Sequence, residues 1–149
     1  MDKKSKELQS IDLCPRLTYG FIIHRYSDNC DIAIESNGID FFAHFLEYSE
    51  GEDFKPYLRP LSSMTEEEAK EIAILHDIKD ILSVKVTSDY IDVIVDDGVC
   101  STYRRTIWFD EIVSSVKCFD FLNAHHFDYR GLIEKGLALE ALPGMYDKH

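Results

Sequence analysis

Alternating apolar and polar positions between residues 83 and 109 form the clearest pattern in the chain. The stretch "SVKVTSDYIDVIVDDG" alternates from Val84 onward, breaks at Ser88-Asp89 and reaches Asp97-Gly98, after which "CSTYRRTIWF" forms a third run. Alternation with period two is typical of half-buried strands, and Asp-Gly is a favoured hairpin turn. The sequence therefore predicts a three-stranded antiparallel meander from Ser83 to Phe109.

Two shorter strands are predicted near the N-terminus. "GFIIHRY" (Gly20 to Tyr26) is rich in β-branched and aromatic residues, and "CDIAIES" (Cys30 to Ser36) places its isoleucines on one face. Asn37-Gly38 suits a turn with positive φ. The next stretch, residues 39–46, fits both a strand that continues this hairpin and a helix; the pattern slightly favours the strand.

Thr65 begins the clearest helix. Its side chain can cap the amide of Glu68 while Glu68 returns the bond, which is the sequence signature of a capping box. Apolar residues then recur at three- and four-residue steps, as in an amphipathic helix, at Ile72, Leu75, Ile78 or Lys79, and Leu82. This face is expected to pack on the sheet.

Two more helices are predicted towards the C-terminus. One begins after a cap at Ser114 or Ser115 and runs to about His125. A short last helix covers about Leu132 to Leu139, with Gly136 inside it, and Pro143-Gly144 ends the domain.

The remaining segments are polar. Residues 1–18 form a lead-in with little expected structure beyond a frayed helix over Lys3 to Gln9, and residues 49–63 form a polar loop. Residues 19–146 are expected to form a single α+β domain. Its antiparallel sheet combines the meander with the N-terminal strands, and two to three helices pack on it.

The charge balance limits the classes of partner. The chain has 149 residues with 28 Asp and Glu against 16 Lys and Arg, a formal net charge of -12. So negative a surface repels phosphate backbones and anionic lipids, which argues against direct binding of nucleic acid or membrane surfaces. No apolar run approaches the ~20 residues of a membrane span. We therefore expect a cytoplasmic protein.

Four cysteines add little chemistry to this picture. They are Cys14, Cys30, Cys100 and Cys118, with no C-x-x-C pair and no regular spacing. This spacing does not indicate a zinc ribbon or a redox pair. Buried free thiols in a reducing cytosol fit best.

The stretch "LNAHHFDYRGLIEKGLALEA" concentrates the residues that could carry chemistry. His125, His126 and Asp128 are ligand types for zinc or iron, and a neutral imidazole can act as a general base. Adjacent side chains on a helix diverge by about 100 degrees, so the two histidines converge on one ion only where the chain unwinds. The three residues are therefore low-ranked metal candidates, and no catalytic residue or cofactor is assigned.

A structural corner explains the same stretch without a ligand. Asp128 is a natural cap for the turn that follows, Arg130 can pair with Asp128 or with a helix C-terminus, and Gly131 permits a positive φ. Phosphate-binding, nucleotide-binding and nucleophile-elbow motifs are absent from the sequence, which lowers the weight of an enzymatic function.

Two segments of the chain resemble a known group of proteins. "YLRPLSSMTEEEAKEI" (Tyr57 to Ile72) and "LNAHHFDYRGLIEKGLALEALPGMY" (Leu122 to Tyr146) are similar to small uncharacterised proteins encoded by bacteroidete phages, prophages and other mobile elements. The group has no established activity, so the resemblance supplies no catalytic residues. It implies a bacterial cytoplasm and a phage-borne gene.

Three functional hypotheses follow. The first is a non-enzymatic protein-binding module, with a host or phage partner such as a protein that has a basic nucleic-acid-binding surface. The second is a small metal-dependent hydrolase that uses His125, His126 and Asp128, with His44 brought in by the fold. The third is a homodimer formed through an exposed apolar patch around Trp108 and Phe109.

Overall fold

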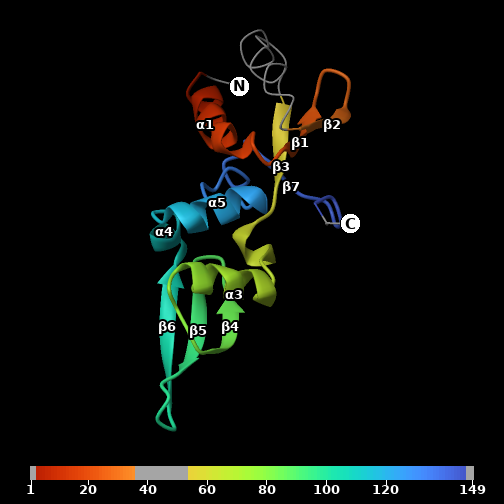
Figure 1. Ribbon diagram of the computed structural model, residues 1–149. Coiled ribbons are helices and arrows are strands. Elements are labelled where there is room, and N and C mark those ends of the chain that lie inside the picture. The colour runs from red at the N-terminus through yellow and green to blue at the C-terminus, as the bar shows by residue number, and fades with distance from the viewer. Residues whose placement is uncertain (1–2, 36–53, 147–149) are drawn as a thin grey trace. The chain divides into compact units, whose positions relative to one another are not determined.

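A computed structural model describes residues 3–35 and 54–146 (Figure 1). The expected α+β class is confirmed, with helices packed on two sheets that are mainly antiparallel. The expectation that the meander and the N-terminal strands share one sheet is wrong, because the N-terminal strands pair with β3 (Phe54–Leu58) instead. The chain divides into two compact units: unit 1 comprises Met1–Arg59 with Asn123–His149, and unit 2 comprises Pro60–Leu122. Unit 1 is thus built from both ends of the chain, and the single domain over residues 19–146 stays a prediction.

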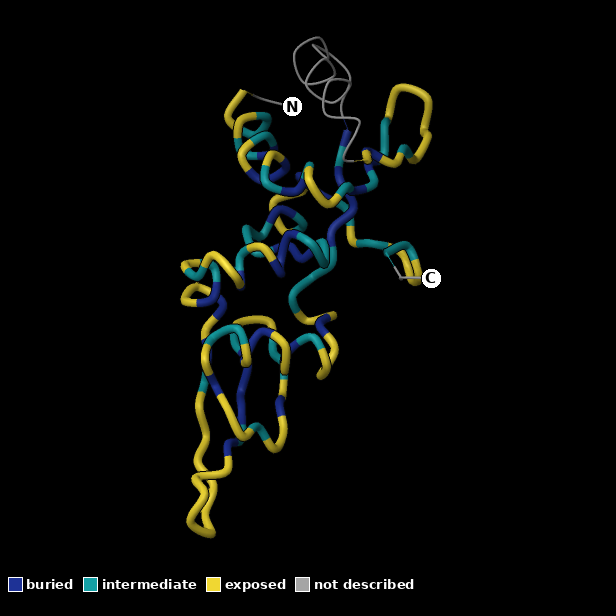
Figure 2. Tube along the Cα trace, in the orientation of Figure 1, coloured by how far each residue is buried: buried dark blue, intermediate teal, exposed yellow. Residues whose placement is uncertain are grey.

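Unit 2 contains the predicted meander. Its sheet has the order β4-β5-β6, with antiparallel pairing throughout, and consists of β4 (Ile81–Val86), β5 (Tyr90–Asp96) and β6 (Thr102–Trp108). Val84 faces Val93, which faces Arg105, so alternate residues share one side of the sheet. Figure 2 shows that the tip of the β5–β6 hairpin is exposed.

The helix of unit 2 begins as predicted and ends earlier. Helix α3 (Glu66–Leu75) has the expected capping box between Thr65 and Glu68. The expected extension of its apolar face to Leu82 is wrong, because Asp77 and Asp80 adopt left-handed φ values of 64° and 57° and turn the chain into β4. Leu82 consequently lies in β4, where it is half-exposed.

Short helical segments connect these elements. A 3-10 turn, η3 (Leu61–Ser63), precedes α3, and α4 (Phe109–Ile112) follows β6 directly. Helix α5 (Val116–Ala124) confirms the helix expected after Ser114 or Ser115.

Unit 1 holds the other sheet, with the order β2-β1-β3-β7. Its elements are α1 (Lys3–Leu13), the 3-10 turn η1 (Cys14–Arg16), β1 (Phe21–Arg25), β2 (Cys30–Ile34), β3 (Phe54–Leu58) and β7 (Leu139–Glu140). The two predicted N-terminal strands are confirmed as β1 and β2. β7 runs parallel to β3, an arrangement that brings the C-terminal segment beside the middle of the chain.

Apolar residues of unit 1 form two buried clusters. The first packs α1 onto the hairpin through Leu13, Phe21, Ile23, Ile34 and Phe54. The second joins β3 to the C-terminal segment through Leu58, Leu132, Leu137 and Ala138. Together they place the core of this unit between segments from both chain ends.

The helix expected over Lys3 to Gln9 is present, but the expectation of little further structure in the lead-in is wrong. Helix α1 extends to Leu13, and Gln9, Asp12 and Leu13 are all buried. A polar helix still orders here because Leu13 packs in the first cluster and the buried polar groups find partners, as described below.

Two further expectations fail in unit 1. The polar loop of residues 49–63 contains β3, in which Pro56 pairs with Ile23, a strand position where proline is uncommon. The last helix expected over Leu132 to Leu139 is instead a series of turns, because Gly136 adopts a φ of 72° before the chain enters β7.

Several expectations lie outside the described residues or concern single side chains. Residues 39–46, including His44, and the turn at Asn37-Gly38 are outside the described ranges. The cysteines are free as expected, whereas the expectation of burial holds for Cys118 and is wrong for the other three, which are exposed. Within residues 3–35 and 54–146, no helix is both long and apolar enough to cross a bilayer.

Candidate functional site

The segment with the paired histidines follows the end of α5 in unit 1. His126 adopts a φ of 65°, the left-handed conformation of the residue that follows a helix end. Its carbonyl accepts a hydrogen bond of 2.7 Å from the amide of Arg59, and the amide of Asp128 donates to the Arg59 carbonyl at 2.8 Å. This short parallel bridge ties the corner to the end of β3.

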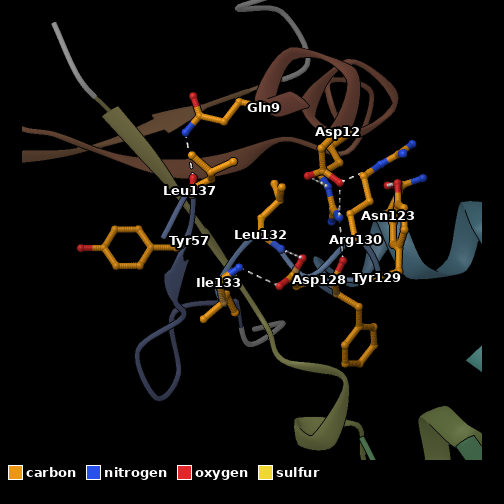
Figure 3. Close-up of polar contacts among 12 residues, drawn as sticks. Gln9, Asp12, Tyr57, Asn123, Asp128, Tyr129, Arg130, Leu132, Ile133 and Leu137 are labelled. Carbon is orange, nitrogen blue, oxygen red and sulfur yellow. Dashed lines mark hydrogen bonds and ion pairs between the residues drawn. The ribbon is translucent and has the colours of Figure 1, made fainter. Parts of the chain in front are cut away.

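Asp128 uses both carboxylate oxygens on the backbone of the turn that follows. Oδ1 accepts from the amide of Leu132 at 2.9 Å, and Oδ2 accepts from the amide of Ile133 at 3.0 Å (Figure 3). The side chain is buried, so loss of these bonds would leave two amides without partners. The geometry is that of the cap expected for a structural corner.

A buried ion pair lies beside this corner. Arg16 Nε donates to Asp12 Oδ2 at 3.0 Å, and both side chains are fully buried. Arg16 Nη2 also donates to the carbonyl of Phe127 at 2.6 Å. Burial raises the pKa of the Asp12 carboxyl, an effect that the positive charge of Arg16 opposes. The pair therefore joins the N-terminal helix to the corner at a high desolvation cost.

Arg130 takes part in the same cluster. Its Nε lies 3.2 Å from Asp12 Oδ1, an ion pair without hydrogen-bond geometry (Figure 3). Arg130 was expected to pair with Asp128 or with a helix C-terminus. The structure corrects this expectation, because the ion-pair partner is Asp12. The sequence could not indicate Asp12, which comes from the opposite end of the chain.

Two more polar side chains connect distant segments of unit 1. Gln9 Nε2 donates to the carbonyls of Phe54 at 3.1 Å and Leu137 at 2.8 Å. The hydroxyl of Tyr146 accepts from the amide of Ile22 at 2.8 Å and donates to the carbonyl of Tyr57 at 2.8 Å. We call Gln9, Asp12, Arg16, Asp128 and Tyr146 the polar clasp.

His126 has a distinct environment within this corner. Its ring stacks on Tyr146 with 3.7 Å between ring centroids, and Nδ1 is buried without a hydrogen-bond partner among the described residues. Burial, together with the positive charge of Arg16, lowers the pKa of His126 to about 4. The imidazole is therefore neutral near pH 7.

The three metal candidates are not brought together as a ligand set. Among residues 3–35 and 54–146, no group of three or more His, Cys, Asp or Glu side chains is placed to hold a metal ion. Asp128 has both oxygens on backbone amides, and His126 is stacked on Tyr146. His44, the fourth candidate, lies outside the described ranges.

Unit 1 contains a second polar cluster that the sequence analysis did not predict. His24 Nδ1 lies 2.7 Å from Asp31 Oδ1, which also accepts from the hydroxyl of Tyr57 at 2.9 Å. The hydrogen bond with His24 lowers the pKa of the Asp31 carboxyl, and burial raises that of Tyr57. His24 and Asp31 are cross-strand partners, so the hairpin register could have indicated this pair.

In unit 2, one side of the sheet carries exposed aromatic and charged residues. Cross-strand pairing places on this side, which we call the outer face, Lys85, Tyr90, Asp92, Arg104, Thr106 and Trp108. Tyr90 and Trp108 contact edge to face, with ring centroids 5.0 Å apart, and Trp108 is 48% exposed. The opposite side carries the buried residues Ile91, Val93, Val95 and Ile107.

Asp92 organises the centre of the outer face. It accepts from Arg104 Nη2 at 2.6 Å and from the Thr106 hydroxyl at 2.7 Å. Desolvation opposes ionisation, but these hydrogen bonds outweigh it and lower the pKa of the Asp92 carboxyl. Arg104 is thereby held on the same face of the sheet as the aromatic pair.

The patch expected around Trp108 and Phe109 is only half correct. Trp108 is exposed, whereas Phe109 is buried at 5% exposure because it begins α4. Tyr90 takes the place of Phe109 beside Trp108, since the two residues face each other across β5 and β6.

Comparison with known proteins gives no match to a family model, to a curated protein or to a solved structure. The functional inference consequently depends on the geometry of the two units.

Proposed function

We propose that the protein is a non-enzymatic protein-binding module that uses the outer face of unit 2. One observation carries the proposal: Trp108, Tyr90 and Arg104 lie together on one exposed side of the sheet. Trp, Tyr and Arg are the residue types that contribute most to binding energy in protein interfaces. A half-exposed tryptophan costs solvation energy that a partner surface would recover.

The preorganised state of Arg104 supports the same function. Its guanidinium is held by Asp92 at 2.6 Å, so part of the side-chain entropy is lost before a partner arrives. The Arg104 side chain is nevertheless 62% exposed, which leaves donors for an acidic or carbonyl group of the partner.

The acidic residues of unit 2 are spread over several of its elements. Asp96, the last residue of β5, and Asp97 lie at one end of the sheet, whereas Asp89 precedes β5 at the other, where its carbonyl accepts from the amide of Phe109. Others lie in the first turn of α3 and in α4. The expected partner with a basic nucleic-acid-binding surface stays a prediction, and this distribution does not favour it. Origin from a phage or mobile element also stays a prediction.

A pull-down from bacteroidete lysate, with and without phage infection, tests the proposal. The tagged full-length protein is compared with Trp108→Ala and with the matched control Tyr103→Ala. Tyr103 is an equally exposed aromatic residue of the same strand, at 51%, on the opposite side of the sheet. We expect a partner, identified by mass spectrometry, that is lost with Trp108→Ala and retained with Tyr103→Ala.

Three results would contradict the proposal. Capture that survives Trp108→Ala, or that both variants abolish, would show that the outer face is not the binding surface. An apparent mass in gel filtration that doubles with concentration and falls with Trp108→Ala would make the partner a second copy of the chain. Near-stoichiometric metal lost in His125→Ala would favour the hydrolase hypothesis.

A further inference from the structure

A groove in unit 1 lies beside the corner that holds the paired histidines. Its volume is about 350 Å³, within the range of small-molecule sites. Ile22 and Ala33, which face each other across β1 and β2, are part of its lining. The described part of its lining also includes Glu35, His126 and Tyr146.

The lining has the charge pattern of a site for a cation. Among the lining residues within 3–35 and 54–146, Glu35 carries the carboxylate, and none is a lysine or an arginine. Burial raises the pKa of Tyr146 to about 12, and that of His126 is lowered to about 4, so both rings are neutral near pH 7. The remaining lining is aromatic and aliphatic, and the negative face of a tyrosine ring attracts cations.

The backbone at His126 indicates that its ring is needed there. His126 has a φ of 65° directly beyond the end of α5, a position where glycine or asparagine is favoured. A residue with a Cβ costs about 1 kcal/mol more than glycine in this conformation. The hydrogen bonds of this residue to Arg59 and Asn123 use only backbone atoms, so glycine could make them too. What histidine adds is a ring that lines the groove.

Tyr146, on which the His126 ring is stacked, is also held in place. The hydroxyl of Tyr146 is fully engaged between the amide of Ile22 and the carbonyl of Tyr57. Its ring therefore stays stacked with His126 at 3.7 Å and offers a fixed aromatic surface. Fixed aromatic walls reduce the entropy that a ligand loses on binding.

We propose that this groove binds a small organic cation, a primary amine with an aromatic or short aliphatic body. The ammonium group pairs with Glu35, and the body packs against Ile22, Ala33 and the stacked rings of His126 and Tyr146. This site is distinct from the outer face of unit 2, since the lining residues that the structure describes all belong to unit 1.

Calorimetric titration of the full-length protein with two matched probes tests the inference. Tyramine carries the ammonium group, and 2-(4-hydroxyphenyl)ethanol replaces it with a hydroxyl on the same body. We expect tyramine to bind at least about tenfold more tightly, the usual scale of one cation–π contact with an ion pair. Equal affinity for the two probes, or no saturable binding of tyramine, would overturn the proposal.

Variants assign the effect to the groove. Glu35→Gln should abolish the preference for tyramine, whereas Glu134→Gln, an exposed carboxylate of the same unit outside the lining, should keep it. His126→Gly suits the local backbone, so it should stay folded by thermal unfolding and yet bind tyramine less tightly. Unchanged binding in Glu35→Gln would contradict the site, as would unchanged binding in a folded His126→Gly.

Discussion

The two units differ in how far apart in the sequence their contacts lie. In unit 2 each strand pairs with the next strand along the chain, and α3 precedes them directly. Unit 1 is closed by bonds such as that from Gln9 to Leu137, which spans 128 positions, and that from Arg16 to Phe127, which spans 111. Local contacts cost less chain entropy to form than distant ones.

This difference indicates that the two units depend on different kinds of interaction. Unit 2 buries one side of a regular meander, and its backbone bonds follow from strand alternation. Unit 1 depends in addition on buried polar side chains, each of which must find its partner to offset desolvation. Substitutions in the polar clasp should therefore cost more than comparable substitutions in unit 2.

Arg16→Met should have the largest effect. It leaves the Asp12 carboxylate buried and removes the bond to the Phe127 carbonyl, at an expected cost of about 3 to 5 kcal/mol in the free energy of unfolding. The control is Arg25→Met, which breaks the more exposed pair with Asp28 and should cost much less, because water screens that pair. Urea denaturation measures both, and equal losses would contradict the role given to the clasp.

The pH dependence of stability should report on His126. Its pKa is about 4 in the folded protein and 6.5 as the ordinary value, so the unfolded chain binds more protons between these pH values. Stability should therefore fall as pH decreases from 6.5 to 4, by on the order of 3 kcal/mol from this residue. His126→Asn, which suits the left-handed backbone, should remove that part of the slope. An unchanged slope in the variant would show that burial of the imidazole is not its cause.

Asp128→Ala and Asp97→Ala compare two aspartates that each cap two backbone amides. Asp128 is buried in unit 1, whereas Asp97 accepts from Val99 and Ser101 in an exposed hairpin of unit 2. We expect a loss of about 2 kcal/mol for Asp128→Ala and a clearly smaller loss for Asp97→Ala, because water can replace only the exposed partners. Chemical denaturation of both variants measures the difference, and the reverse order would refute the argument.

Thr65→Ala should have the smallest effect. It removes one half of the capping box of α3, a local interaction worth about 1 kcal/mol. Hydrogen exchange followed by mass spectrometry should show faster exchange in α3 and no change in β1 or β3. Thr65→Ser keeps the hydroxyl and should exchange as the parent does; faster exchange in this control would point to the methyl group instead.

The features that the sequence predicted correctly are mostly those that depend on local contacts, as in unit 2. The capping box at Thr65 and the strand alternation after Ser83 are local signals, and the structure confirms both. β3 was missed because Pro56 and neighbouring polar residues obscure its alternation. A helix was predicted after Leu132 because apolar residues recur along that stretch. In the structure these residues reach the second cluster from a series of turns.

For the candidate site, residue types were more informative than spacing. Asp128 was expected to cap the following turn, and it does so through two amides. The partner of Arg130, the stacking of His126 on Tyr146 and the groove beside them could not be inferred, because each depends on which distant segments meet.

By itself, the sequence determined the α+β class, the meander, the N-terminal hairpin and the capped helix. These features depend on side-chain periodicity and on bonds between near neighbours in the chain, which any such segment can form. Only the tertiary structure decided that the two ends of the chain form one unit around a polar clasp. A buried charge does not specify its partner, because the energy depends on which opposite charge the fold brings within a few ångströms.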